Sequence, residues 1–191
     1  MGRSALDGDT NMISGRELSR DEITGIWAID RSELIHSMYY LEKGELRSRP
    51  ERHDVQGWPP GEAEKYTPIL EACHDHGGWL YGLFDDQRLI GAAVLESHLI
   101  GRAGDQLQLS FLHVSNRYRH QGWGRHLFSL AQVEARRRRA KSLYISATPS
   151  AGTIGFYLSL GCKVTSEPDP ELLAREPDDI HLECALPEAV I

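Results

Sequence analysis

The feature that most constrains the fold is an apolar segment, Gln106–Val114, that leads through a glycine turn into a stretch whose apolar residues recur at helical spacing. In this turn Arg119 precedes Gly122 and Gly124. A strand that enters a helix through glycines directs unpaired backbone N–H groups and the positive end of the helix dipole at one place, where an anion binds. The sequence therefore predicts a phosphate site, although a tight turn without a ligand fits the two glycines equally well.

Two common phosphate-binding motifs do not match this turn. A dinucleotide-binding fingerprint needs a third glycine and an acidic residue about twenty positions later, and both are missing. A P-loop needs Gly-Lys-Ser or Gly-Lys-Thr, which the sequence does not contain. Dinucleotide and ATP sites of these two types are therefore excluded.

The composition is that of a soluble, acidic protein with one core. The chain has 191 residues, of which 40% are hydrophobic, and a formal net charge of -7. This charge argues against nucleic-acid and anionic-membrane partners and favours small or cationic ones. The longest apolar run, 89–95, is shorter than the roughly 20 residues that span a bilayer, and the polar N-terminus has no signal core, so we expect a cytoplasmic protein. Cys73, Cys162 and Cys184 lack disulfide or metal-ligand spacing, which predicts reduced thiols and no metal.

Periodicity and turn residues predict alternating helices and strands in a single domain, 1–191, without a linker that would divide it. Residues 1–10 are expected to form a loose terminus, and 38–61 a hairpin and loop insertion with a turn at Lys43-Gly44. Strands are predicted at 12–18, 79–84, 89–96, 106–114, 143–146 and 181–186. A helix is predicted from Ser19 to Asp30, and its capping box pairs Ser19 with Glu22. A second helix is predicted at 62–74, with Tyr66, Ile69, Leu70 and Cys73 on one face. Two more helices are expected, one after the glycine turn and one at 150–159.

A second motif follows the turn. It reads Phe156-Tyr157-Leu158-Ser159-Leu160-Gly161-Cys162 and comes after a predicted strand. Together the two motifs resemble the GNAT superfamily of acyl-CoA N-acyltransferases, whose pyrophosphate loop has Arg or Gln, two residues, Gly, one residue, and Gly or Ala. The later signature of that family is Phe-Tyr, three residues, Gly-Phe, so Cys162 departs from it and is interpreted as core packing. The resemblance covers 77–186 and leaves 38–61 unmatched.

The resemblance implies a mixed α/β (α+β) fold with a mostly antiparallel sheet, splayed central strands and flanking helices. It also implies acetyl-CoA as cosubstrate, no metal, and transfer of the acetyl group to a primary amine by direct attack in a ternary complex. The matching cofactor-binding residues are Leu112, His113 and Val114 for the pantetheine arm, and Arg119, His120, Gln121, Gly122, Trp123, Gly124, Arg125 and His126 for the pyrophosphate. The N–H groups of 121–126 and the side chains of Arg119 and Arg125 are expected to hold the pyrophosphate, with Trp123 as an apolar plug under the loop.

Tyr157 matches the tyrosine that protonates the leaving thiolate of coenzyme A in much of this family. A phenol with a pKa near 10 suits a thiolate whose conjugate acid has a pKa of about 8.5 to 10. A half-buried helix tyrosine without a catalytic role is the alternative interpretation. Ser150 stands where relatives usually carry Asn and is also the expected N-cap of its helix, which weakens its assignment to the cofactor.

The general base is not evident, because relatives often carry Glu or His at the positions of Gln108 and Ser110, and neither residue is a useful base. Glu96 and His98, two apart and expected on one face of the neighbouring strand, are the next candidates. Solvated surface side chains are the alternative interpretation of both. Glu33, which the sequence places on the early helices, is a weaker third candidate.

Several interpretations of partner and function stay open at this level. The four arginines within 135–141 fit a solvated helix C-terminus better than a nucleic-acid patch. The acidic side chains before the last strand could attract a cationic amine, whether aminoglycoside-like, a polyamine, an amino acid or a protein N-terminus; they are Glu167, Asp169, Glu171, Glu176, Asp178 and Asp179. A non-catalytic coenzyme A-binding regulatory or interaction domain is the main rival, and a nucleic-acid-binding module ranks third. A homodimer is also possible.

Overall fold

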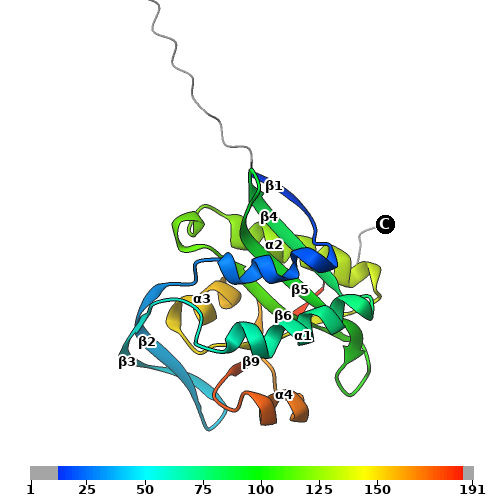
Figure 1. Ribbon diagram of the computed structural model, residues 1–191. Helices are drawn as coiled ribbons and strands as arrows, with labels where there is room; N and C mark the ends of the chain where they lie inside the picture. The colour runs from blue at the N-terminus through cyan, green and yellow to red at the C-terminus, as the bar shows by residue number, and fades with distance from the viewer. Residues whose placement is uncertain (1–12, 187–191) are drawn as a thin grey trace, which may run out of the picture.

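A seven-stranded sheet forms the centre of the computed structural model, which describes residues 13–186 (Figure 1). Its strand order is β1-β4-β5-β6-β7-β9-β8, and only β6 and β7 are parallel neighbours. Its strands are β1 (Ile13–Glu17), β4 (Trp79–Asp85), β5 (Arg88–Ile100), β6 (Gln106–Val114), β7 (Ser142–Ala147), β8 (Lys163–Val164) and β9 (Ile180–Ala185). The helices are η1 (Arg20–Ala28), α1 (Glu62–Asp75), η2 (Asn116–Tyr118), α2 (Trp123–Arg137), α3 (Ala151–Ser159) and α4 (Pro170–Arg175). The loose terminus expected for residues 1–10 lies outside the described residues.

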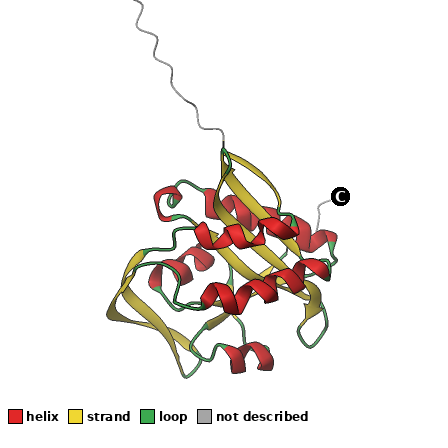
Figure 2. Cartoon of the chain, viewed as in Figure 1, coloured by secondary structure: helices red, strands yellow, loops and turns green. Residues whose placement is uncertain are grey.

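Helices cover both faces of the sheet. Figure 2 shows η1 and α1 in front of the strands, with α2 and α3 behind them. The apolar run of β5 alternates between the two sides: Ile90 and Ala93 join the core under α2 and α3, while Ala92 and Val94 join the core under η1 and α1. A strand covered on both faces has no polar side, which is why this segment is apolar throughout. The predicted mixed fold with a mostly antiparallel sheet and flanking helices is confirmed.

The first predicted helix is present, but as the 3-10 helix η1. Ile23, Ile26 and Ile29 are spaced by three and are almost fully buried. Three residues per turn places such side chains on one line, so the isoleucine spacing fits a 3-10 helix better than an α-helix. The predicted capping box between Ser19 and Glu22 is present at its start.

The predicted hairpin is present, but its first strand begins at Glu33, earlier in the chain than the expected residue 38. Strands β2 (Glu33–Glu42) and β3 (Glu45–Val55) form a separate two-stranded sheet around a turn at Lys43 and Gly44, both with positive φ. The placement of Glu33 on a helix is therefore wrong, because Glu33 is the first residue of β2. Among the contacts of the hairpin with the rest of the chain, the N–H of Tyr39 donates to the carbonyl of Pro149 at 2.7 Å.

Other departures from the sequence analysis concern short or exposed segments. The structure adds β8 and α4, neither of which was predicted. On α1, Leu70 and Cys73 are buried as expected, whereas Ile69 is 42% exposed. None of the helices within 13–186 is long and apolar enough to cross a membrane.

The two central strands separate partway along their length. Pairing between β6 and β7 covers only Gln106 to Gln108 on β6, opposite Ser142 to Tyr144 on β7. On the other edge of β6 the register with β5 shifts, so that Val94 pairs with Phe111 while Leu95 pairs with Leu109. This shift leaves Ser110 as an extra, bulged residue, and a bulge bends its strand. The splayed central strands of the predicted fold are confirmed.

The buried isoleucines Ile23 and Ile26 of η1, with Ile29 at its end, should contribute strongly to the stability of the fold. We expect Ile26→Ala to lower the free energy of unfolding by about 2–5 kcal/mol, because Ile26 is fully buried and its truncation leaves a cavity. As a control, Val133→Ala on the exposed face of α2 should change it by less than about 0.5 kcal/mol. Urea unfolding followed by circular dichroism measures both, and equal losses would contradict the packing role of η1.

Candidate active site

A cleft with a volume of about 1770 Å³ opens where β6 leaves β7. One half is bordered by the glycine turn, the start of α2 and the start of α3. The other half is bordered by α1, α4, the loop after β3 and the end of β5. The bulge of β6 at Ser110 and the neighbouring residues within 108–114 also line the cleft.

The glycine turn presents a row of free backbone donors. Gly122 has φ of 90° and His120 has φ of 61°, and α2 begins directly afterwards at Trp123. Within the described part of the chain, no acceptor is found for the N–H groups of 120–125. Donors that converge at the positive end of a helix dipole form an anion-binding site. The phosphate site predicted from the sequence therefore has the local geometry that such a site needs.

The inclusion of His126 among the phosphate donors is wrong. Its N–H already donates to the carbonyl of Gly122 at 2.9 Å, because it is the first amide that the helix itself can satisfy. Gln121 and Trp123 do not line the cleft with their side chains, and Trp123 packs against the core under α2. Arg125 does line the cleft.

The second glycine serves the packing of α2 against α3. A Cβ on Gly124 would lie 3.3 Å from the ring of Phe156, closer than almost all real contacts of this kind. Phe156 belongs to the second sequence motif and packs against Phe128 of α2. The two motifs therefore meet in space, and Gly124 permits their close approach.

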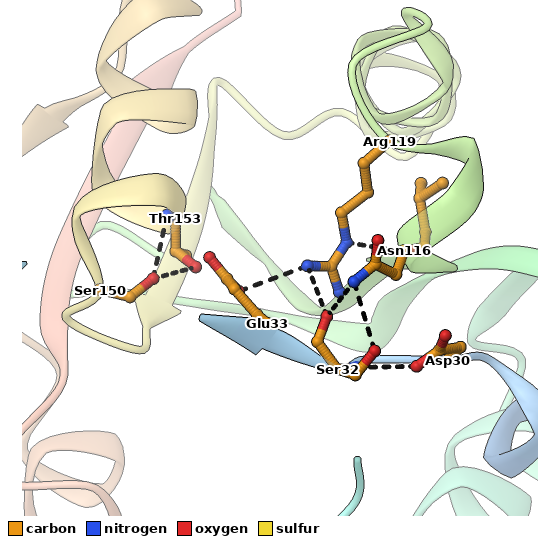
Figure 3. Close-up of polar contacts among 8 residues, drawn as sticks. Asp30, Ser32, Glu33, Asn116, Arg119, Ser150 and Thr153 are labelled. Atoms are coloured by element: carbon orange, nitrogen blue, oxygen red, sulfur yellow. Dashed lines mark hydrogen bonds and ion pairs between the residues drawn. The ribbon is translucent and has the colours of Figure 1, made fainter. Parts of the chain in front are cut away.

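Arg119 contacts the end of β6 and the segment that leads into β2 (Figure 3). Its Nε donates to the carbonyl of Val114 at 2.9 Å, and its Nη1 lies 3.4 Å from both the carbonyl of Ser32 and Oε2 of Glu33. Asn116 adds a hydrogen bond from its side chain to the carbonyl of Ser32 at 2.7 Å. This contact between 30–33 and 115–119 could not be predicted, because no local pattern links segments so far apart in the chain.

Tyr157 lies at the floor of the cleft on α3. It is 6% exposed, and burial raises the pKa of its phenol above the ordinary value, so the hydroxyl keeps its proton. Its ring packs against Phe128 and Phe156. Ser150 is the N-cap of the same helix, as expected: its Oγ accepts a hydrogen bond from the N–H of Thr153 at 3.1 Å.

The two candidate bases lie in the half of the cleft bordered by α1 and α4, in an irregular stretch of β5. The register with β6 shifts between Leu95 and Leu99, so the two-residue spacing of Glu96 and His98 does not by itself place them on one face. Both nevertheless line the cleft; Glu96 is half-buried and His98 is exposed. Burial and the nearby Glu96 carboxylate raise the pKa of Cys73 to about 12, which places Glu96 next to that thiol.

An aromatic wall covers the exit of β6, and the sequence analysis missed it. Trp58, from the loop after β3, stacks on Phe111 with ring centroids 5.7 Å apart and meets the ring of His113 at 5.0 Å. Its Nε1 donates to the carbonyl of Ile29 at 2.8 Å. The guanidinium of Arg31 lies over the same indole, 4.9 Å from its centroid. The segment that matched no motif therefore supplies one wall of the cleft.

Comparison with known proteins identifies the family. Residues 36–162 match the model of the acetyltransferase (GNAT) family. A search of curated proteins found no significant match. Among solved structures, nourseothricin acetyltransferase superposes with a TM-score of 0.67 at 18% identity, covering 92% of this chain and 99% of that one.

Two further structures have the same fold. The PaiA N-acetyltransferase from Thermoplasma acidophilum, in complex with coenzyme A, has a TM-score of 0.57 at 17% identity, with 91% of this chain and 99% of that one covered. The ribosomal-protein-S18-alanine N-acetyltransferase from Escherichia coli has a TM-score of 0.58 at 15% identity, with 94% and 99% covered. At these identities the likeness concerns the fold alone.

The packing of His113 in the wall predicts a pH dependence of stability. Burial, with the positive charges of Arg31 and Arg119, lowers the pKa of His113 to about 3. In the unfolded chain the pKa is about 6.5, so between these values only the unfolded chain takes up the proton and stability falls as pH falls. We expect His113→Phe, which keeps a ring in place, to reduce this loss by up to about 1.4 kcal/mol per pH unit. Urea unfolding between pH 7 and pH 4.5 measures the slopes, and identical slopes would rule out an imidazole that stays neutral in the folded protein.

Proposed function

Since this chain belongs to the acetyltransferase (GNAT) family, we propose that it transfers the acetyl group of acetyl-CoA to a primary amine by direct attack of that amine on the thioester. The single observation that carries the proposal is the row of free N–H groups in 120–125, at the start of α2 and beside the opening between β6 and β7. A diphosphate supplies acceptors for these donors. The adjoining cleft has room for the rest of the cofactor.

We assign the pantetheine arm to the open edge of β6. Residues 112–114 pair with β5 on one side, and on the other side β7 has already diverged. Their free backbone groups can pair with the amides of an extended arm, as a strand would. The arm would then extend from the glycine turn to the bulge at Ser110 and place the thioester there. This position is next to the half of the cleft bordered by α1 and α4, which we call the acceptor half.

Tyr157 is the proposed general acid. It lines the cleft, and its raised pKa keeps the phenol protonated at neutral pH. As the amine attacks the thioester carbon and the tetrahedral intermediate collapses, the C–S bond breaks and the thiolate takes the phenolic proton. No cysteine acyl-enzyme is involved, and Cys162 is buried under α3.

The acceptor amine must lose a proton before it attacks. A primary amine with a pKa of about 10.4 is mostly protonated at pH 7, and exposing its lone pair costs about 4 to 5 kcal/mol. We propose Glu96 and His98 as the groups that accept this proton, directly or through water. Gln108 and Ser110 lie in the same part of the cleft and cannot accept it.

The acceptor half of the cleft favours a cationic substrate. Glu176 accepts a hydrogen bond from the phenol of Tyr66 at 2.9 Å, which joins α4 to α1 across this end. Asp179 lies beside it, and burial together with the Glu176 and Asp178 carboxylates raises its pKa. Lys65 lies beside the phenol of Tyr66 and Arg175 also lines the cleft, but the carboxylates of this half outnumber its cations, and the excess negative charge attracts an ammonium group. Two of the similar structures are named for acting on an antibiotic and on a ribosomal protein, so both small and protein amines belong in a substrate screen.

The proposal is tested by calorimetry with coenzyme A and by thiol release from acetyl-CoA against a panel of amines. We expect Tyr157→Phe to bind coenzyme A as tightly as the unmodified protein and to lower kcat by about a hundredfold or more, because only the proton donor is removed. Leu158→Ala, on the exposed side of the same helix, is the control and should leave kcat unchanged. Absence of coenzyme A binding by the unmodified protein would refute the proposed function.

The base assignment predicts a change in pH profile. We expect kcat/KM of Glu96→Gln or His98→Gln to fall by roughly a hundredfold at pH 7 and to keep rising up to pH 9, as the free amine loses its proton unaided. The unmodified enzyme should level off at lower pH. Ser97→Ala, between the two residues in the same cleft, is the matched control and should keep the original profile. Unchanged profiles in both variants would eliminate both candidates.

A further inference from the structure

The side chain of Glu33 lies in the half of the cleft bordered by the glycine turn and the start of α3, which we call the cofactor half. Its Oε2 lies 3.4 Å from Nη1 of Arg119, which follows β6 in the turn before α2. Its Oε1 lies 2.9 Å from where a Cβ of Gly152 would be, in the first turn of α3. Figure 3 shows the carboxylate between the guanidinium on one side and the start of α3 on the other. One carboxylate therefore joins the two elements that border the cofactor site.

Both partners of Glu33 are features that attract anions. Arg119 carries a guanidinium that is 23% exposed, and the first turn of α3 carries the positive end of a helix dipole. Ser150 satisfies the N–H of Thr153, but no acceptor for the N–H group of Gly152 is found within 13–186. A negative charge at this place is stabilised by the same forces that would stabilise a phosphate.

The backbone next to Glu33 is fixed, so that the carboxylate can move without the segment that carries it. The N–H of Asn116 donates to the carbonyl of Asp30 at 2.8 Å, and the N–H of Asp30 donates to Oγ of Ser115 at 3.0 Å. The side chain of Asn116 holds the carbonyl of Ser32. By contrast, within the described residues the Glu33 carboxylate has a single ion pair, longer than a good charge-assisted hydrogen bond, and is 34% exposed.

We propose that Glu33 is an internal anion that takes the place of the cofactor's negative charge in the free enzyme and competes with coenzyme A for Arg119 and the start of α3. This inference rests on the proposed function. When acetyl-CoA binds, the carboxylate leaves the gap and the Arg119 guanidinium becomes available to the phosphates, while its Nε bond to Val114 is kept. When coenzyme A leaves, the carboxylate returns. Glu33 is a positioning residue that lowers cofactor affinity and favours release of the product.

The test compares two variants of equal charge. Glu33→Gln removes the carboxylate from the cleft, while Glu42→Gln removes one from the far, exposed end of the same strand. Calorimetric titration with coenzyme A should give a dissociation constant roughly three- to tenfold lower for Glu33→Gln, because a nearby like charge is gone, and an unchanged one for Glu42→Gln. Glu33→Ala should tighten binding as well, and inorganic diphosphate as the probe should show the same order. Melting temperatures confirm that each variant is folded.

The possible results separate the two proposals. Loss of a merely structural contact would weaken the binding of coenzyme A, so tighter binding in both Glu33 variants supports competition. Unchanged or weaker binding in both variants, with binding by the unmodified protein intact, overturns the inference and leaves the proposed function standing. If Glu33→Gln and Glu42→Gln increased the affinity for coenzyme A equally, the net charge of the protein alone would explain the change, and the inference would be overturned. If the unmodified protein does not bind coenzyme A, the proposed function and this inference fail together.

Discussion

Strands β6 and β7 separate early, and this opening at the centre of the sheet determines where the cleft lies. Strands in the middle of a sheet normally satisfy each other's backbone groups, and buried groups without partners are costly. Here the parallel pairing stops at Gln108, and the bulge at Ser110 turns the remainder of β6 away. The sheet thus acquires an open edge at its centre, covered on both faces by helices. A ligand with extended, amide-containing structure can fill such an edge as a strand would.

Charge divides the cleft that this separation creates. Towards the cofactor half, the starts of α2 and α3 and the Arg119 guanidinium provide positive potential. Towards the acceptor half, Glu96, Glu176 and Asp179 provide negative potential. In the proposed reaction, an anionic acyl carrier and a cationic amine each meet a complementary end of the cleft, with the thioester between them. Glu33 lies on the positive side of the cleft and carries a negative charge. We therefore interpret it as a competitor of the anionic cofactor, whereas the other carboxylates would attract the cationic amine.

Much of the fold could be predicted from local patterns, and the exceptions share a cause. The isoleucine spacing, the capping box at Ser19 and the glycine turn all act within a few residues, so their signals are visible in the chain. Strand β8 has two residues and α4 has six, too short for periodicity to indicate them. Glu33 was assigned to a helix because only its pairing with Val55 on β3 makes it part of a strand.

The candidate site shows the same division. Local sequence patterns were enough to predict the turn with Gly122, the cap at Ser150 and the helix that carries Tyr157, because backbone geometry and capping are properties of adjacent residues. The packing of the whole chain brings Gly124 against Phe156, Trp58 over His113, and Glu33 to Arg119. Those contacts join segments distant in sequence, and their geometry is set by how the two helical layers and the hairpin pack around the divided sheet, which no single segment encodes.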